Sequence, residues 1–180
     1  MIKFRKHNSS IKAIYQNILD SSRSKLFYLD YDVEDTFESR FDIIVLHSFI
    51  IFQYFLDYKI KKSEISQSLF DYMFDDFDNN LREMGFGDIA VNKKMKSFIV
   101  AFYGRVANYS KGIEKFRLEN SIDLLSTSIK KNIYKGNEKN DLKSILLSNY
   151  IFDNLEYFSS KPHDSNIKNN FKFNVKLGPI

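Results

Sequence analysis

The stretch "LFDYMFDDFDNNLREMGFGDIAV", residues 69–91, decides the fold because it contains both a helix and its end. Large apolar residues recur at intervals of three or four, which is the spacing of one face of an α-helix. With the preceding turn, that face consists of Ile65, Leu69, Met73, Phe77, Leu81 and Met84. Gly85 and Gly87 then interrupt the pattern, so the stretch predicts a helix that ends at a turn.

The glycines specify the kind of turn. With Gly85 as the left-handed residue after the helix, Phe86 and Leu81 stand where the apolar contact of a Schellman motif is made. Gly87 frees the backbone for a sharp change of direction, and Asp88 is expected to cap the next helix. The stretch therefore predicts two long helices folded into an antiparallel hairpin.

The remaining segments also have helical spacing. Residues 35–58 are apolar nearly all round, which indicates a central helix, with Asp35 or Thr36 as its cap. The other expected helices cover residues 9–28, 62–84, 91–113, 118–134 and 141–158. No proline occurs in residues 1–161. We therefore expect an all-α, single-domain bundle of about five to six helices with a long central helical hairpin.

The C-terminal end has a different period. "FKFNVKL", residues 171–177, alternates apolar and polar residues, which is typical of extended chain. A single strand on a helical body has few partners, so we expect it to dock as an extended tail rather than pair with another chain. The predicted organisation is a basic end over 1–8, a helical domain over 9–160 and a basic extended tail over 161–180.

Composition excludes several classes of protein. The chain has 180 residues, of which 43% are hydrophobic and 28% charged, as in ordinary soluble domains. It has no cysteine, which removes disulfides, thiol nucleophiles and cysteine-ligated zinc. The most apolar run, residues 41–56, contains Asp42 and is shorter than the about 20 residues of a membrane span. No apolar run follows the basic start, so a secretory signal is not expected.

Basic residues concentrate at the two ends. Residues 1–12 contain four basic side chains and no acidic one, and residues 161–180 contain four lysines and one aspartate. Such ends favour transient contact with the ribosome or an anionic membrane surface, or they only increase solubility. We expect no sequence-specific binding of nucleic acid.

The aspartates of residues 71–78 could form a solvated face or a metal site. Asp71, Asp75, Asp78 and Arg82 share one helix stripe, where Asp78 and Arg82 can pair one turn apart. Alternatively, "DYMFD" at 71–75 matches the DxxxD pattern of magnesium-dependent prenyl-diphosphate enzymes. That chemistry needs a second acidic motif at helical spacing, which the sequence does not contain. We therefore predict no metal and no cofactor.

Three residues within the expected helices predict particular contacts inside the protein. His47 is expected to be a buried, hydrogen-bonded core residue rather than a ligand or base. Arg105 continues the stripe of the return helix, so it must pair with a carboxylate, either Asp42 or Asp88. Gly104 inside a helix predicts the close passage of another helix. No nucleophile–base pair or glycine-rich phosphate loop occurs in the sequence.

Two segments together resemble the ubiquinol–cytochrome c chaperone family. They are "RFDIIVLHSFI" (40–50) and "SLFDYMFDDFDNNLREMGFGDIAVNKKMKSFIVAFYGRVANY" (68–109), and the resemblance extends over roughly residues 10–160. The positions that it marks for family or partner-binding roles are Asp42, His47, Asp71, Asp75, Asp78, Arg82, Glu83, Gly85, Gly87, Asp88, Lys94, Tyr103, Gly104 and Arg105.

The resemblance implies an all-helical, non-catalytic assembly chaperone. Family members bind newly made cytochrome b and support assembly of the bc1 complex, so the implied partner is cytochrome b or a related respiratory membrane protein. The arginine-poor start resembles the bacterial form, which implies a cytoplasmic protein, with a peripheral position at the inner face of the membrane as the alternative. A generic helical interaction module remains a further hypothesis.

Overall fold

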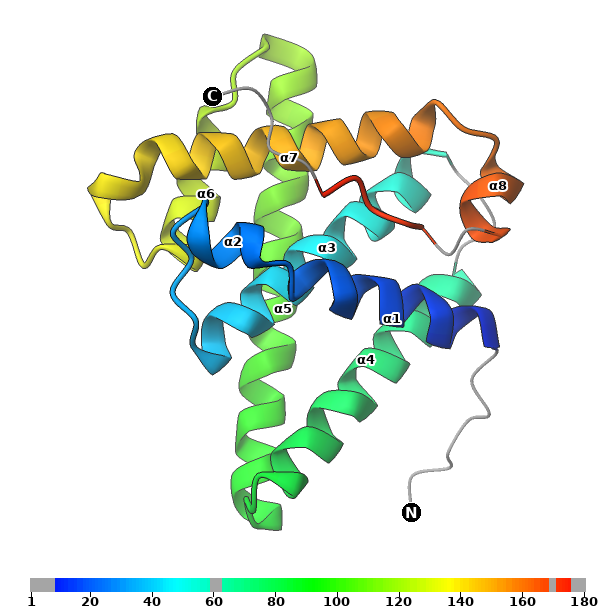
Figure 1. The fold of residues 1–180 in the computed structure, drawn as a ribbon, viewed down its shortest axis with the longest axis vertical. Coiled ribbons are helices and arrows are strands. Elements are labelled where there is room, and N and C mark those ends of the chain that lie inside the picture. The colour runs from blue at the N-terminus through cyan, green and yellow to red at the C-terminus, as the bar shows by residue number, and fades with distance from the viewer. Residues whose placement is uncertain (1–8, 59–62, 169–170, 176–180) are drawn as a thin grey trace.

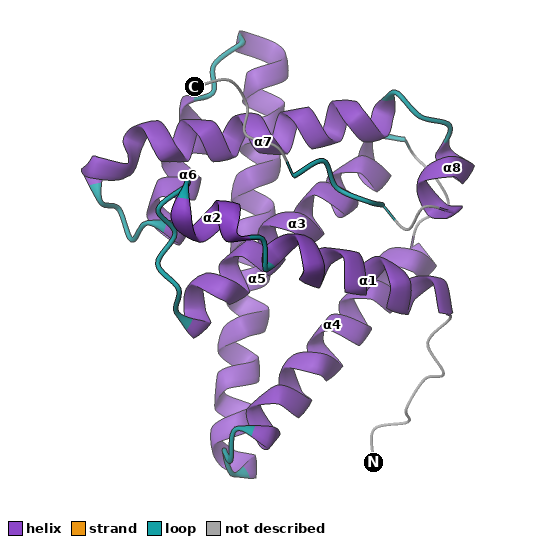
Figure 2. Cartoon of the chain, in the orientation of Figure 1, coloured by secondary structure: helices purple, strands orange, loops and turns teal. Residues whose placement is uncertain are grey.

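A computed structural model describes residues 9–58, 63–168 and 171–175, and this part of the chain is helical with no strand (Figures 1 and 2). The elements in chain order are α1 Ser9–Ser22, α2 Lys25–Leu29, α3 Phe37–Asp57, α4 Ser63–Glu83, α5 Asp88–Glu119, α6 Asp123–Ile133, the 3₁₀ turn η1 Glu138–Asn140, α7 Asp141–Ser159 and α8 His163–Lys168. The prediction of an all-α, single-domain bundle is confirmed.

Helix α3 is the centre of the core. It packs against α1, α5, α6 and α7, and among the described residues it is the one helix long and apolar enough to span a membrane. Of its most apolar 18-residue window, 78% is buried inside the protein, so α3 is a core helix. Thr36 caps its start, as predicted, by accepting a hydrogen bond from the Ser39 amide.

Helices α4 and α5 form the predicted hairpin, which meets at one end of the molecule (Figure 1). Gly85 has φ +88°, and the Phe86 amide donates to the Leu81 carbonyl at 3.2 Å. The Gly85 amide donates to the Arg82 carbonyl at 2.9 Å, which completes the Schellman motif. The expected cap by Asp88 is wrong, because Gly87 occupies the N-cap position and Asp88 is the first residue of α5.

The first predicted helix, over 9–28, is two helices. Arg23 and Ser24 separate α1 from α2, and the Ser24 hydroxyl accepts a hydrogen bond from the Leu26 amide. Serine at this position competes with helix continuation because it caps the next helix instead.

The close helix crossing predicted at Gly104 occurs elsewhere on α5. A Cβ added at Gly104 would meet no atom within 4 Å, so that expectation is wrong. A Cβ added at Gly112 would lie 2.8 Å from Cα of Leu125 on α6. Gly112 is therefore the residue that allows two helices to approach, and Gly104 lies on an open face.

The C-terminal tail docks on the helical body without forming a strand. The segment predicted to be extended from 161 begins with α8, where the Pro162 carbonyl accepts the first turn's amide hydrogen bonds. Phe171 is a turn residue with φ +52°, and residues 172–175 form neither helix nor strand. Phe171 and Phe173 are buried, and Lys172 between them is exposed. The alternation thus reflects one face turned toward the core. The predicted basic end over 1–8 lies outside the described residues.

Candidate functional site

Arg82 of α4 forms ion pairs on both sides of the hairpin turn. Arg82 Nε lies 2.6 Å from the Asp78 carboxylate, and its Nη1 also pairs with Asp88 at the start of α5. The predicted pair of Asp78 and Arg82 is confirmed. Arg82 and Asp88 are exposed, so water screens both pairs. The arrangement orders the turn rather than a ligand.

The other aspartates of α4 make separate contacts. Asp71 accepts a hydrogen bond from the Gln67 amide at 2.6 Å. Asp76, which the sequence did not mark, accepts one from the Tyr15 hydroxyl at 2.8 Å and so joins α4 to α1. In the described part of the chain, no three histidine, aspartate or glutamate side chains are grouped closely enough to hold a metal ion. Asp71 and Asp75 thus have no second group of acidic ligands near them in the described residues, and the DxxxD hypothesis requires one.

Asp42 and Arg105 form the predicted ion pair between α3 and α5. Arg105 Nη2 lies 2.6 Å from Asp42 Oδ1, and the two side chains are 18% and 7% exposed. The guanidinium also lies over the Phe41 ring, 5.5 Å from its centroid. Burial raises the pKa of Asp42 to about 6, although Arg105 opposes this shift. The pair connects the hairpin to the central helix.

His47 is a core histidine, as predicted. It is fully buried, and its Nδ1 lies 2.8 Å from the Ile43 carbonyl while Nε2 lies 2.9 Å from the Tyr150 hydroxyl. A carbonyl only accepts, so Nδ1 carries the proton and Nε2 accepts from Tyr150. Burial lowers the pKa of His47 to about 4, so the ring is neutral at pH 7. Both nitrogens are occupied, which leaves none for a ligand.

Several marked residues lie on the exterior of the hairpin. Glu83, Gly85 and Gly87 are exposed at the turn, and the Lys94 ammonium lies 5.0 Å from the Phe86 ring centroid. This cation–π contact covers the apolar residue of the turn.

An exposed apolar face surrounds Tyr103 on α5. Tyr103 is 56% exposed and Val100 is 74% exposed, and Gly104 is exposed beside them. Ile99 of α5 and Phe70 of α4 extend the face, with the Phe70 and Tyr103 rings 5.6 Å apart. We call these five residues the Tyr103 face. A shallow groove of about 310 Å³ adjoins it, lined by Phe52, Ser66, Gln67, Phe70, Phe102, Tyr103 and Val106.

The apolar set on α4 divides between core and surface. Met73, Phe74 and Phe77 are at most 7% exposed, whereas Met84 is 58% exposed. The expectation that Met84 continues the apolar face is therefore wrong, because α4 ends at Glu83 and Met84 belongs to the turn that follows.

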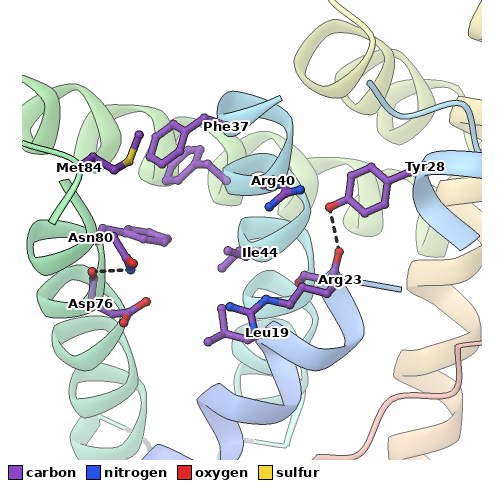
Figure 3. A pocket seen from close by; sticks show the side chains of 12 residues that line it. Leu19, Arg23, Tyr28, Phe37, Arg40, Ile44, Asp76, Asn80 and Met84 are labelled. Atoms are coloured by element: carbon purple, nitrogen blue, oxygen red, sulfur yellow. Dashed lines mark hydrogen bonds between the residues drawn. The ribbon is translucent and has the colours of Figure 1, made fainter. Parts of the chain in front are cut away.

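A second hollow lies between α1, α3 and α4 (Figure 3). Its volume is about 190 Å³, and we call it the α1–α4 cleft. The cleft is lined by Leu19, Ser22, Arg23, Tyr28, Phe37, Arg40, Phe41, Ile44, Asp76, Phe77, Asn80 and Met84. These residues come from four helices, so no local sequence pattern indicated the cleft.

Residues 29–173 match the family described as ubiquinol-cytochrome C chaperone. The chain belongs to this family. The match includes the α4–α5 hairpin, both members of the buried ion pair and the first residues of the docked tail.

A solved structure is similar to this chaperone over almost its whole length. The crystal structure of the Cbp3 homolog from Brucella abortus is 24% identical in sequence, with a TM-score of 0.78. The similarity covers 93% of this chain and 90% of that one, and it shows a common fold. No curated protein matches the chain in sequence.

The marked residues of the chaperone thus fall into two groups. Asp42, His47 and Arg105 are largely buried and connect helices of the core through the ion pair of Asp42 with Arg105 and the hydrogen bond of His47 with Tyr150. Tyr103 and Gly104 are exposed, although the Tyr103 ring also contacts Phe70. The second group is available to another molecule.

Proposed function

We propose that this protein is a non-catalytic assembly chaperone of ubiquinol–cytochrome c reductase and that its client is newly made cytochrome b. Membership of the chaperone family supports the assembly role. The client assignment goes further, and it rests on the need to shield the apolar segments of a membrane protein before insertion. The proposal places the protein on the cytoplasmic side of the membrane.

The observation that carries the proposal is the Tyr103 face. Val100 and Tyr103 present large apolar surfaces to solvent within a segment that marks the family. Neither is needed to cover the core, which is closed by Phe102 on the opposite side of α5. Exposed apolar residues gathered in one place indicate a binding surface.

The geometry suits an apolar helix as the bound segment. Gly104 has no side chain, so the backbone of a client helix could approach α5 beside Tyr103 and Val100. The groove next to the face accepts side chains of such a helix. The face consists of few residues, which favours weak, reversible binding and hence release of the client to the assembling complex.

A transient contact of the basic ends with the ribosome or with anionic lipid would complement this role. Such attraction brings the chaperone to sites of membrane-protein synthesis and weakens as salt concentration rises. It remains part of the proposal.

The experiment is deletion of the gene followed by complementation. Deletion should lower both cytochrome b and assembled bc1 complex, and the wild-type chain should restore them. A Val100→Asp/Tyr103→Ser variant should fold but fail to restore either, because it places polar groups on the client surface. Leu118→Asp is the matched control, since Leu118 lies on the same helix, is 78% exposed and is outside the face. Normal bc1 levels after deletion would overturn the proposal.

A further inference from the structure

The α1–α4 cleft has the size and lining of a pocket for one apolar side chain. Phe41 and Phe77 are buried in its wall, and Leu19 and Ile44 are partly exposed to it. An apolar cavity of about 150 Å³ holds a benzene molecule. The cleft, at about 190 Å³, therefore matches a single phenylalanine, leucine or methionine side chain.

The mouth of the cleft is cationic. The Arg23 guanidinium forms no ion pair or hydrogen bond with a described residue, and it lies beside Leu19 at the opening (Figure 3). A shallower hollow continues from the cleft and shares Arg23, Tyr28 and Arg40 with it. Lys25 lines that hollow and also has no partner among the described residues.

The acidic groups nearby are already engaged. Arg40 holds Asp35 through two hydrogen bonds, of 2.6 and 3.0 Å. Asp76, at the far side of the cleft, accepts the Tyr15 hydroxyl. Arg23 and Lys25 are thus the cations at the mouth that pair with no acid among the described residues, and they complement carboxylates next to the bound apolar side chain.

We propose that the α1–α4 cleft docks a segment of a partner protein in which a large apolar residue is followed by acidic residues. The apolar side chain enters between α1, α3 and α4, and the carboxylates meet Arg23 and Lys25. The cleft shares no lining residue with the groove beside the Tyr103 face, so this site is independent of the client surface. The protein thus has two binding surfaces of different chemistry.

Asp35 beside the opening and Asp76 at the far side of the cleft favour a peptide over a phosphate backbone. A nucleic acid would require a broad, continuous cationic surface, whereas here two acids limit the positive region to one side. A short acidic segment needs only that side.

The test uses the full chain and a defined peptide probe. The probe is a fluorescein-labelled peptide with a central phenylalanine followed by two glutamates, and a second peptide replaces both glutamates by lysine. Fluorescence polarisation should show saturable binding of the acidic peptide and binding at least about fivefold weaker for the basic one. Phosphatidylglycerol vesicles test the alternative source of anionic groups.

Two variants address the site itself. Arg23→Glu reverses an exposed charge at the mouth and should weaken binding of the acidic peptide about fivefold or more. Lys12→Glu is the matched control, because it makes the same charge change at an exposed position of α1, outside the lining of the cleft, and should leave binding unchanged. Met84→Glu, at an exposed position of the lining, should also weaken binding through repulsion.

Three results would overturn the proposal. One is equal binding of the acidic and basic peptides. Another is that the Arg23→Glu variant binds the acidic peptide as tightly as the wild-type chain. The third is that the protein binds vesicles but not the acidic peptide, and that Arg23→Glu abolishes the binding of vesicles. The site would then recognise lipid. None of these depends on cytochrome b levels, so they are separate from the test of the assembly role.

Discussion

Replacing Gly104 by alanine is expected to stabilise the fold and to impair the chaperone. Gly104 lies inside α5, and an added Cβ would meet no atom within 4 Å. Glycine in a helix interior costs about 0.5–1 kcal/mol relative to alanine, because it loses more backbone freedom on folding. The free energy of unfolding of Gly104→Ala should rise by that amount, which for a chain of this size raises Tm by about 1–4 °C.

Gly112→Ala is the matched control for this measurement. It makes the same chemical change on the same helix, but its Cβ would lie 2.8 Å from the Leu125 backbone. Overpacking of this kind costs about 1–3 kcal/mol, so the variant should be less stable than the wild type. Urea titrations followed by circular dichroism would measure both changes, and the two variants should differ in sign.

The functional half of this prediction concerns the approach of the client. A methyl group at Gly104 keeps the backbone of a bound helix farther from α5, so Gly104→Ala should restore less bc1 complex than the wild-type chain in the deletion strain. If Gly104→Ala were less stable than the wild type, the conclusion that the surroundings of Gly104 are open would be refuted. Full restoration of bc1 complex would refute the use of Gly104 by the client.

Three further predictions concern the turn, the tail and the buried ion pair. Gly85→Ala should lower the free energy of unfolding by about 1–2 kcal/mol, because alanine is strained at φ +88°, and thermal denaturation measures this. Phe173→Ala should lower it by about 3–5 kcal/mol, since the ring is 7% exposed, as urea titration would show. Burial raises the pKa of Asp42 to about 6, above its unfolded value, so the folded state holds the proton more tightly. The stability that Asp42 contributes is thus full below about pH 4 and is lost as pH rises to about 6, an effect of about 3 kcal/mol that Asp42→Asn should remove. Urea titrations from pH 4 to 7 test this.

Each of these expectations has a comparison that can contradict it. Gly87→Ala is the control for Gly85→Ala, because Gly87 has a negative φ and open surroundings, and equal losses would exclude backbone strain. Lys172→Ala changes an exposed neighbour of Phe173 and should cost little. For Asp42, the difference between wild type and variant cancels His47, which titrates in the opposite sense. A difference that does not change with pH would show that folding does not raise the pKa of Asp42.

Much of the helical hairpin could be predicted from sequence because its determinants are local. Leu81, Gly85 and Phe86 form the Schellman turn through bonds between near neighbours. The pairing of Arg105 with Asp42 could be predicted as one of two options, since a buried guanidinium requires a carboxylate. Which carboxylate lies within reach depends on how α3 and α5 cross, and that information is not local.

The wrong expectations have the same origin. A glycine in a helix signals either a close neighbour or an open face, and Gly112 and Gly104 are one of each. Alternating residues at 171–175 report one buried side, which an extended tail and a strand both have. The α1–α4 cleft could not be predicted, because its walls come together only through tertiary packing.

The docked tail also sets the order in which the chaperone can mature. The Phe173 ring packs edge-on against His47, with ring centroids 4.8 Å apart, although it follows His47 by more than a hundred residues. Phe171 likewise contacts Tyr54 and Phe55 of the central helix. The contacts of the tail with His47, Tyr54 and Phe55 therefore form only after residue 173 has left the ribosome, and until then this part of the surface of α3 lacks its tail cover. The chaperone thus passes through a stage in which part of its own apolar centre is uncovered.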